Sequence, residues 1–260
     1  QYNAQYSVVL STQNGMYPYS TSVPFIIPVA MPSGYDPTGP DLGGYYAYSS
    51  DDVLFEQSPQ YNWVEVNSVG TMLSVPSNGN YTQTVSLPFN FKFYNNNSSQ
   101  VRISSDGWIA LGSGTQVAPE NYPLPHQDDI NNMVCAFWDD LFSTYPNEGK
   151  LYYYNDAANH SFIVEWDKVK HADDTLNTET FQIILLDPVY YPTQSGNGEI
   201  IFQYKMVEEP GASTIGIEDN TETIGLQYAF DGIYDITATE VRNEYAIKFT
   251  TNTPTVVSVE

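Results

Sequence analysis

LPFNFKFYNNNSSQVRISSDGWIALGS, residues 87–113, is the stretch that decides the fold class of this chain. Within Phe89–Tyr94, large apolar side chains at every second position give the period-two pattern of a strand with one buried face. The run Asn95–Ser99 predicts a turn, because asparagine tolerates left-handed backbone angles. Val101–Ser104 predicts the return strand, and a further turn leads into a third strand at Trp108–Leu111. The stretch therefore predicts an antiparallel β domain, and it contains no catalytic signature.

Segments of strand-like composition occur along the rest of the chain, separated by turn-forming residues. Outside the central stretch we expect strands at Tyr45–Tyr48, Tyr61–Val66, Thr84–Leu87, Lys150–Tyr154, Ser161–Trp166, Thr180–Leu186, Glu199–Tyr204, Ser213–Ile217, Thr223–Tyr228 and Glu244–Phe249. About ten or eleven strands joined by turns are typical of a β-sandwich. We therefore expect an all-β fold, an antiparallel β-sandwich of jelly-roll-like topology with an extended β segment at its N-terminus.

The N-terminal residues differ in composition from the rest of the chain. They contain two apolar stretches, Tyr6–Leu10 and Val23–Val29, and prolines in the second confine it to an edge position. A run rich in proline and glycine follows and predicts a linker. We divide the chain into an N-terminal extension and candidate donor strand at 1–34, a linker at 35–40, a sandwich at 41–250, and a C-terminal tail or edge strand at 251–260.

Apolar strands that lie outside the main domain must be covered by another surface. An extended segment of this kind can add to the exposed sheet edge of a neighbouring copy through main-chain hydrogen bonds. Head-to-tail addition that does not close into a ring generates a filament. We therefore expect a structural, self-assembling subunit of a surface fibre or layer, although the segment could instead fold back on its own sandwich. The residues expected to make the contact are Tyr6, Val8, Leu10, Phe25, Ile27 and Val29.

The charge of the chain restricts its partners and its compartment. Acidic residues outnumber basic ones 31 to 8, and the formal net charge is -23. Such a surface repels nucleic acids and anionic membranes, and no apolar run is long enough to span a bilayer. The single cysteine, Cys135, excludes an intrachain disulfide and lies in an apolar strand, where we expect it to be buried. Scarce lysine, abundant Tyr, Asn, Thr and Ser, and a start at Gln1 favour a secreted or cell-surface protein after signal removal.

The sequence contains no recognisable catalytic set. There is no G-x-S-x-G motif, and three histidines fall in predicted loops without metal-ligand spacing, namely His126, His160 and His171. Glu165 and Asp167 share one face of a predicted strand and Trp166 lies on the other, but two acids are easily found among so many. We therefore expect no enzymatic activity.

Two acidic pairs flank the strand that carries Trp138, and they are the candidate cation ligands. Calcium takes several oxygen ligands from loops, and these pairs supply carboxylates, although no D-x-D-x-D-G run is present. The alternative is that the second pair ends the strand and caps the following turn. The candidate calcium ligands are Asp128, Asp129, Asp139 and Asp140, and no other cofactor is expected.

The many aromatic residues suggest an alternative function, because flat rings stack on sugars. The four tryptophans, Trp63, Trp108, Trp138 and Trp166, all lie in alternating strands, where a core position is the ordinary outcome. Tyr152–Tyr154 must expose at least one ring whichever face of the strand is buried. The alternative to a structural subunit is therefore an adhesion or carbohydrate-binding module with a glycan or cell-surface partner, or a part of a larger secreted hydrolase.

Several segments together resemble a known extracellular module. They are GPDLGGYYAYSSDD (39–52), PQYNWVEV (59–66), LPFNFKFYN (87–95), ISSDGWIALGS (103–113), VCAFWDDL (134–141), YYYNDAANHSFIVEW (152–166), TFQIILLDP (180–188) and GNGEIIFQY (196–204). Their order resembles a β-sandwich module of secreted bacterial proteins, found beside extracellular proteases or ahead of type IX secretion sorting tails. VCAFWDDL is also distantly similar to the extracellular domain of nidogen-type proteins. The resemblance covers roughly Gly39–Thr250; it implies a secreted, non-catalytic module and transfers no ligand residues.

Overall fold

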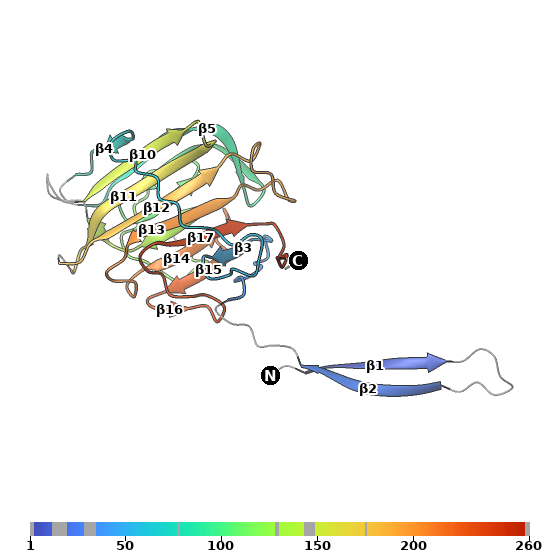
Figure 1. Cartoon of the computed structure of the whole chain (residues 1–260). Helices are drawn as coiled ribbons and strands as arrows, with labels where there is room; N and C mark the ends of the chain where they lie inside the picture. The colour runs from blue at the N-terminus through green and yellow to red at the C-terminus, as the bar shows by residue number, and fades with distance from the viewer. Residues whose placement is uncertain are drawn as a thin grey trace. The chain divides into compact units, whose positions relative to one another are not determined.

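Antiparallel strands build this chain, and both tight turns and long loops join them (Figure 1). The computed structural model describes residues 3–11, 20–28, 35–76, 79–127, 130–142, 149–174 and 176–257, the first two ranges by their backbone. The strands in these residues are β1 (Asn3–Ser11), β2 (Ser20–Pro28), β3 (Tyr46–Ser49), β4 (Thr71–Leu73), β5 (Thr82–Phe93), β6 (Asn96–Ser104), β7 (Trp108–Leu111), β8 (Met133–Trp138), β9 (Leu141–Phe142), β10 (Lys150–Asp156), β11 (Ser161–His171), β12 (Glu179–Leu186), β13 (Ile200–Met206), β14 (Thr214–Glu218), β15 (Gly225–Phe230), β16 (Ile233–Tyr234) and β17 (Tyr245–Thr250). No helix occurs among these residues.

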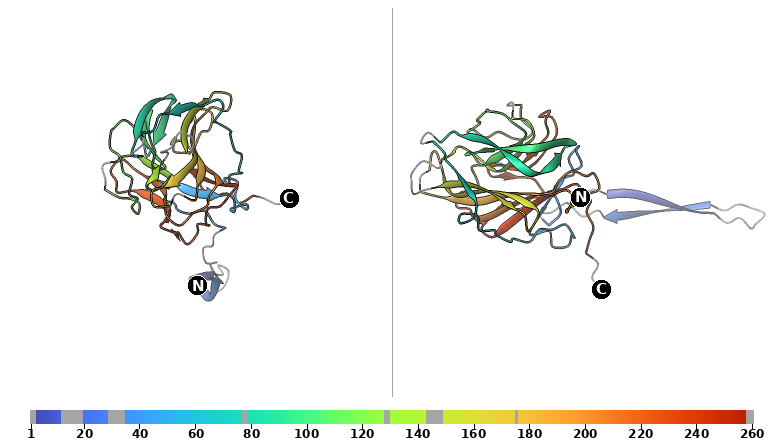
Figure 2. Two further views of the ribbon diagram at one scale, coloured as in Figure 1. Left: turned by 90° about the vertical axis from the view of Figure 1, so that its left-hand side faces the viewer. Right: turned by 90° about the horizontal axis from the view of Figure 1, so that it is seen from above.

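The chain divides into two units, Gln1–Ser33 and Gly34–Glu260. The first contains the paired strands β1 and β2. In the second, one sheet has the strand order β3-β17-β13-β12-β11-β10-β4, with β9 added beside β11. The other sheet has the order β16-β15-β14-β8-β7-β6-β5. All pairings are antiparallel, and Figure 2 shows the two sheets lying face to face. The predicted antiparallel β-sandwich is confirmed.

The core lies between the two sheets and is rich in aromatic side chains. In β12, Phe181, Ile183 and Leu185 point into this core, whereas Ile184 and Leu186 belong to a smaller cluster on the outer face. The Trp166 indole of β11 donates a hydrogen bond to the Ser104 carbonyl of the opposite sheet at 3.0 Å. These alternating positions follow directly from the period-two pattern of the sequence.

The turn between β5 and β6 is shorter than predicted. Tyr94 and Asn95 form it alone, with φ angles of 43° and 64°. Two consecutive residues with positive φ are the signature of a type I′ hairpin turn, whose twist matches that of the flanking strands. Asn96–Ser99 therefore already belong to β6, and their prediction as turn residues is wrong.

The segment predicted as a strand at Tyr61–Val66 is not a strand. It is an extended segment, called the strap below, whose backbone forms hydrogen bonds with outward-facing side chains of the sheet beneath it. The Gln203 side chain accepts from the Asn62 backbone N–H at 2.6 Å and donates to the Asn62 carbonyl at 2.9 Å, and Gln182 donates to the Val64 carbonyl at 2.5 Å. The strap has the composition of a strand because Val66 is buried against the apolar cluster on this outer face.

Both ends of the sandwich unit form backbone hydrogen bonds with other segments of the unit. Thr38, within the segment predicted as a linker, exchanges two backbone hydrogen bonds of 2.9 Å with Ala47 of β3. Near the C-terminus, Val256 forms a bridge with Phe55, and the Val257 N–H donates to the Leu54 carbonyl at 2.8 Å.

Gly107 is the position at which the central turn tolerates least change. Its φ is +77°, and a Cβ added there would lie 1.8 Å from the Phe137 carbonyl oxygen. We expect Gly107→Ala to destabilise the protein by more than about 1 kcal/mol, because alanine adds strain and a backbone clash. Gly211→Ala is the matched control, since a Cβ there meets nothing within 4 Å. Equal midpoints of the two variants in urea unfolding would contradict this expectation.

Candidate functional site

The N-terminal hairpin has one apolar face. β1 pairs with β2 along all nine residues of each strand, with Tyr6 opposite Phe25 and Val8 opposite Val23. Directly opposed residues of an antiparallel pair belong to one face, as do residues two apart along a strand. The register therefore gathers on a single face the residues Ala4, Tyr6, Val8, Leu10, Val23, Phe25 and Ile27, together with Thr21, whereas Val9 and Ile26 lie on the other face.

This hairpin contains most of the residues predicted for self-assembly. Five of the six share its apolar face, and the sixth, Val29, lies outside the described residues. The hairpin is also free of charged side chains, because the first charged residue of the chain is Asp36. Electrostatic repulsion between acidic copies of the protein is therefore weakest at this unit.

Two of the four predicted calcium ligands lie in the described part of the chain. Asp128 and Asp129 lie outside the described residues. Asp139 follows β8 and contacts a histidine, and Asp140 donates its backbone N–H to the Asp139 carboxylate at 2.8 Å. Among the described residues, no three His, Cys, Asp or Glu side chains are grouped so that they could hold a metal ion. Calcium binding stays a prediction, which isothermal titration tests directly.

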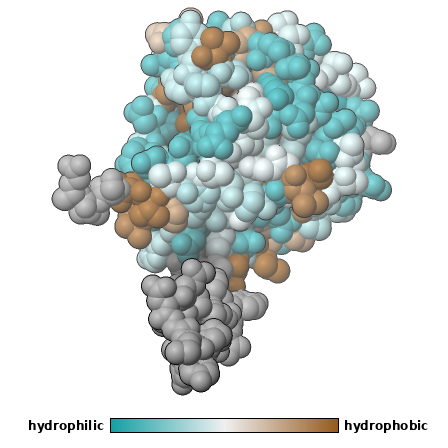
Figure 3. Space-filling view, turned by 90° about the vertical axis from the view of Figure 1, so that its right-hand side faces the viewer, coloured by the Kyte–Doolittle hydropathy of each residue, from teal (hydrophilic) through white to brown (hydrophobic). Residues whose placement is uncertain are grey.

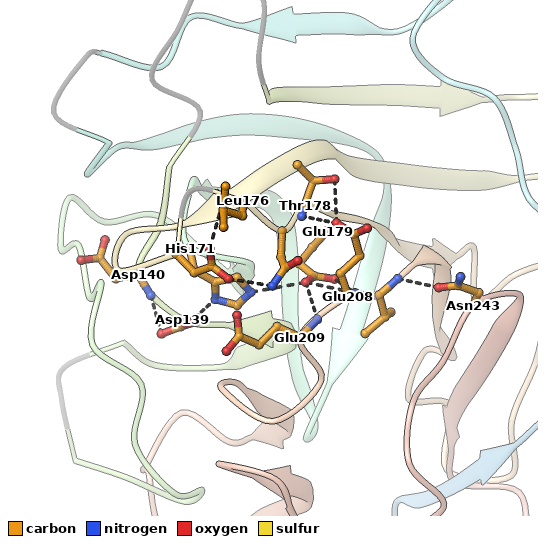
Figure 4. A network of polar contacts seen from close by, with 12 residues as sticks. Asp139, Asp140, His171, Leu176, Thr178, Glu179, Glu208, Glu209 and Asn243 are labelled. Carbon is orange, nitrogen blue, oxygen red and sulfur yellow. Dashed lines mark hydrogen bonds and ion pairs between the residues drawn. The ribbon is translucent and has the colours of Figure 1, made fainter.

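A buried charge network joins the two sheets beside these aspartates (Figure 4). The His171 ring is fully buried at the end of β11, and its Nδ1 lies 2.5 Å from Asp139 Oδ2. On the other side of the ring, Nε2 lies 3.4 Å from Glu179 Oε1 at the start of β12. Glu179 also accepts backbone hydrogen bonds from Glu208 at 3.0 Å and Glu209 at 2.9 Å, which ties down the loop after β13.

The prediction of His171 in a loop is wrong, because β11 extends to this residue. Lys168 has a φ of +56°, and a register shift between Trp166 and Val169 lets the strand continue past an irregularity. Burial alone would lower the pKa of His171, but the hydrogen bonds and charges of Asp139 and Glu179 raise it to about 10. The imidazole is therefore protonated at neutral pH and unsuited to act as a general base.

Glu165 and Cys135, two further residues considered for chemistry, are buried. Burial raises the pKa of Glu165 to about 7, and its carboxylate accepts a hydrogen bond from Gln182 at 2.6 Å. The strap covers this pair, since Gln182 also binds the Val64 carbonyl. Cys135 is buried as predicted, within a cluster that includes Trp108 and Trp138.

The outer face beside the strap contains a depression of about 370 Å³. Ile163, Ile184 and Leu186 form its apolar floor. Its polar rim consists of Gln60, Asn62, Asp156, Asn159, Ser161, Tyr191 and Gln203. Three of the four tryptophans are fully buried, and Trp63 remains half-buried near this face, stacked on Tyr61.

Large apolar side chains elsewhere on the surface are scattered. Figure 3 shows separate hydrophobic patches among hydrophilic residues on one face. The most exposed apolar side chains of the sandwich unit include Leu42, Leu176 and Val189. A second depression, of about 540 Å³, lies beside β16 and is lined by Asp41 and Asp235 as well as by Ile233 and Ile236.

Comparison with known proteins identifies one family. A family described as NIDO related matches residues 54–257, which is well over half of the chain. The match is consistent with the resemblance to nidogen-type extracellular domains. No curated protein and no solved structure matches the chain. The described residues include no helix with the length and hydropathy needed to cross a membrane.

The free energy of unfolding should fall as the pH rises from about 6.5 to about 10. The stabilisation by protonated His171 is complete below the ordinary pKa of 6.5 and is lost as the pH rises through the folded-state pKa of about 10. Asp106 acts in the same direction, because burial raises its pKa to about 8 and the folded state keeps a proton that the unfolded state releases. Urea unfolding across this pH range measures the change.

His171→Gln tests the network itself. It leaves two carboxylates without their cation, so we expect a loss of about 3–5 kcal/mol at neutral pH. The pH dependence between about 7 and 10 should also flatten in this variant. An unchanged slope would mean that His171 does not carry the dependence.

Proposed function

The chain belongs to the NIDO-related family, whose match spans residues 54–257, and on this premise we propose that it is a non-enzymatic extracellular structural protein. It assembles with copies of itself into a fibre or layer, and the hairpin β1–β2 is the element that joins them. Domains of this family are typical of extracellular proteins. The hairpin lies before the matched residues and is thus an addition to the family domain.

The single observation that carries the proposal is an uncharged, two-stranded hairpin whose register gathers seven apolar residues on one face. An isolated two-stranded hairpin is at best marginally stable in water, so this unit needs a partner surface. Each strand also has one edge unpaired within the hairpin, and such edges add to other sheets through main-chain hydrogen bonds. Addition to a second copy leaves that copy's hairpin available for a third, which makes the assembly open-ended.

The polar interior of the sandwich supports a structural role. His171 is held protonated between two carboxylates, and Glu165 is covered by the strap. These groups connect strands and loops through hydrogen bonds. None of them lies at a substrate-sized cavity that also contains a free nucleophile. They therefore add rigidity to the domain, which suits a structural subunit.

Charging the apolar face of the hairpin should prevent assembly. We expect Val8→Asp combined with Phe25→Asp to weaken association by on the order of 100-fold or more, because an unpaired charge buried at an interface costs about 3–5 kcal/mol. Light scattering and negative-stain electron microscopy of the full chain and this variant give the measurement.

The control is Ser7→Asp combined with Ser22→Asp. Ser7 lies opposite Pro24 and Ser22 opposite Val9, so these changes give the same net charge on the other face of the same strands. Assemblies from the parent chain and the control, but not from the apolar-face variant or a chain lacking residues 1–34, support the proposal. If the parent chain is a monomer at every accessible concentration, the proposal is wrong.

The depression on the outer face favours glycan binding as a second candidate function. Its apolar floor and amide-rich rim are the composition of a small-ligand site. A glycan array probed with the full chain should then give hits that Tyr191→Ala reduces at least tenfold, since Tyr191 forms part of the rim. An array without hits, with and without calcium, would remove this candidate.

A further inference from the structure

The two sheets of the sandwich end in four edge strands. These strands differ in length and in whether their outer edges are covered. β16 and β4 have two and three residues, which is too short for extended pairing. β3 is covered by the Thr38–Ala47 bridge of its own chain. β5 has twelve residues and pairs only with β6, so among the described strands of the sandwich it is the long edge left open.

The two halves of β5 are protected differently. In the C-terminal half, Pro88 lacks an N–H, the register with β6 breaks between Ser86 and Phe91, and the Lys92 carbonyl already accepts from Gly198 at 2.6 Å. Proline, irregular register and lysine are the usual devices that keep an edge from pairing with another chain. The N-terminal half, Thr82–Leu87, contains none of them and pairs with β6 in regular register up to Ser86.

The charge pattern of the sequence singles out the same edge. Residues 66–105 contain no Asp or Glu, although the chain has 31, and this range includes all of β4, β5 and β6. Lys92 and the buried Arg102 are the charged residues of the range. Asp106, which follows it, is buried with its pKa raised to about 8 and is therefore mostly neutral at pH 7. Glu65, which precedes it, is paired with Lys205 at 2.9 Å.

We propose that the outer edge of β5 at Thr82–Leu87 is the acceptor that pairs with the β1–β2 hairpin of a second copy of this chain. This inference rests on the proposed function and assigns the acceptor surface to which the hairpin adds. Two molecules of net charge -23 repel each other over most of their surfaces. An uncharged nine-residue strand and an edge without carboxylates can approach with little repulsion, and both have backbone groups to pair. The depression beside β16 is a poorer acceptor, because Asp41 and Asp235 line it.

The test adds charge to this edge of the full chain. Gln83 and Ser86 are exposed residues of β5, so Gln83→Glu with Ser86→Glu should keep the fold and lower the association constant at least tenfold. The control is Thr253→Glu with Thr255→Glu, which are also exposed and give the same net charge away from β5. Melting temperatures within a few degrees of the parent chain establish that both variants are folded.

Mixing separates the acceptor from the donor. The β5 variant keeps an intact hairpin, and the Val8→Asp, Phe25→Asp variant keeps an intact β5 edge. An equimolar mixture should therefore give one-to-one pairs by light scattering, and it should give no assemblies larger than these pairs. Normal fibres from the β5 variant, with none from the hairpin variant, would overturn this acceptor while the proposed function stands. A parent chain that never assembles would overturn both.

Discussion

The sandwich depends on polar atoms of aromatic side chains that cross the core. The Trp166 indole bonds to the Ser104 carbonyl, and the Tyr204 hydroxyl donates to the Ala136 carbonyl at 2.8 Å, in each case from one sheet to the backbone of the other. Because these atoms are fully buried, losing either bond would leave a polar group without a partner in the core. The two sheets can therefore slide past each other only at a large free-energy cost, and their mutual register is specified.

The same requirement for partners applies to the buried charges. Asp139, His171 and Glu179 come from three elements, and their charges compensate one another at the place where the sheets meet the loop after β13. A protonated ring between two carboxylates has both of its N–H groups engaged. Two features at the periphery lack such charges: a hairpin without charged residues and a strand edge without carboxylates.

The alternation of apolar and polar residues predicted most of the strands. It did not predict features that depend on partners distant in the sequence. Alternation identified β12, since Phe181, Ile183 and Leu185 are two residues apart and all face the core. It failed at Tyr61–Val66, which alternates like a strand but bonds to Gln182 and Gln203, more than 100 residues away. His171 was missed because Asp139 precedes it by 32 residues and meets it only when the sheets pack. The hairpin pairing was likewise hidden, because neither apolar stretch indicates that the other is its neighbour.

The bond from the Val257 N–H to the Leu54 carbonyl has a consequence for how this domain can be used. It brings the first and last residues of the family match side by side. A domain whose ends meet can be inserted into a surface loop of a host protein, or joined end to end and reopened at an exposed turn, without disturbing its core. The core also contains Tyr45 and Ala47, which precede the match, so a transferred unit has to carry β3 with it, whereas the hairpin β1–β2 belongs to a separate compact unit.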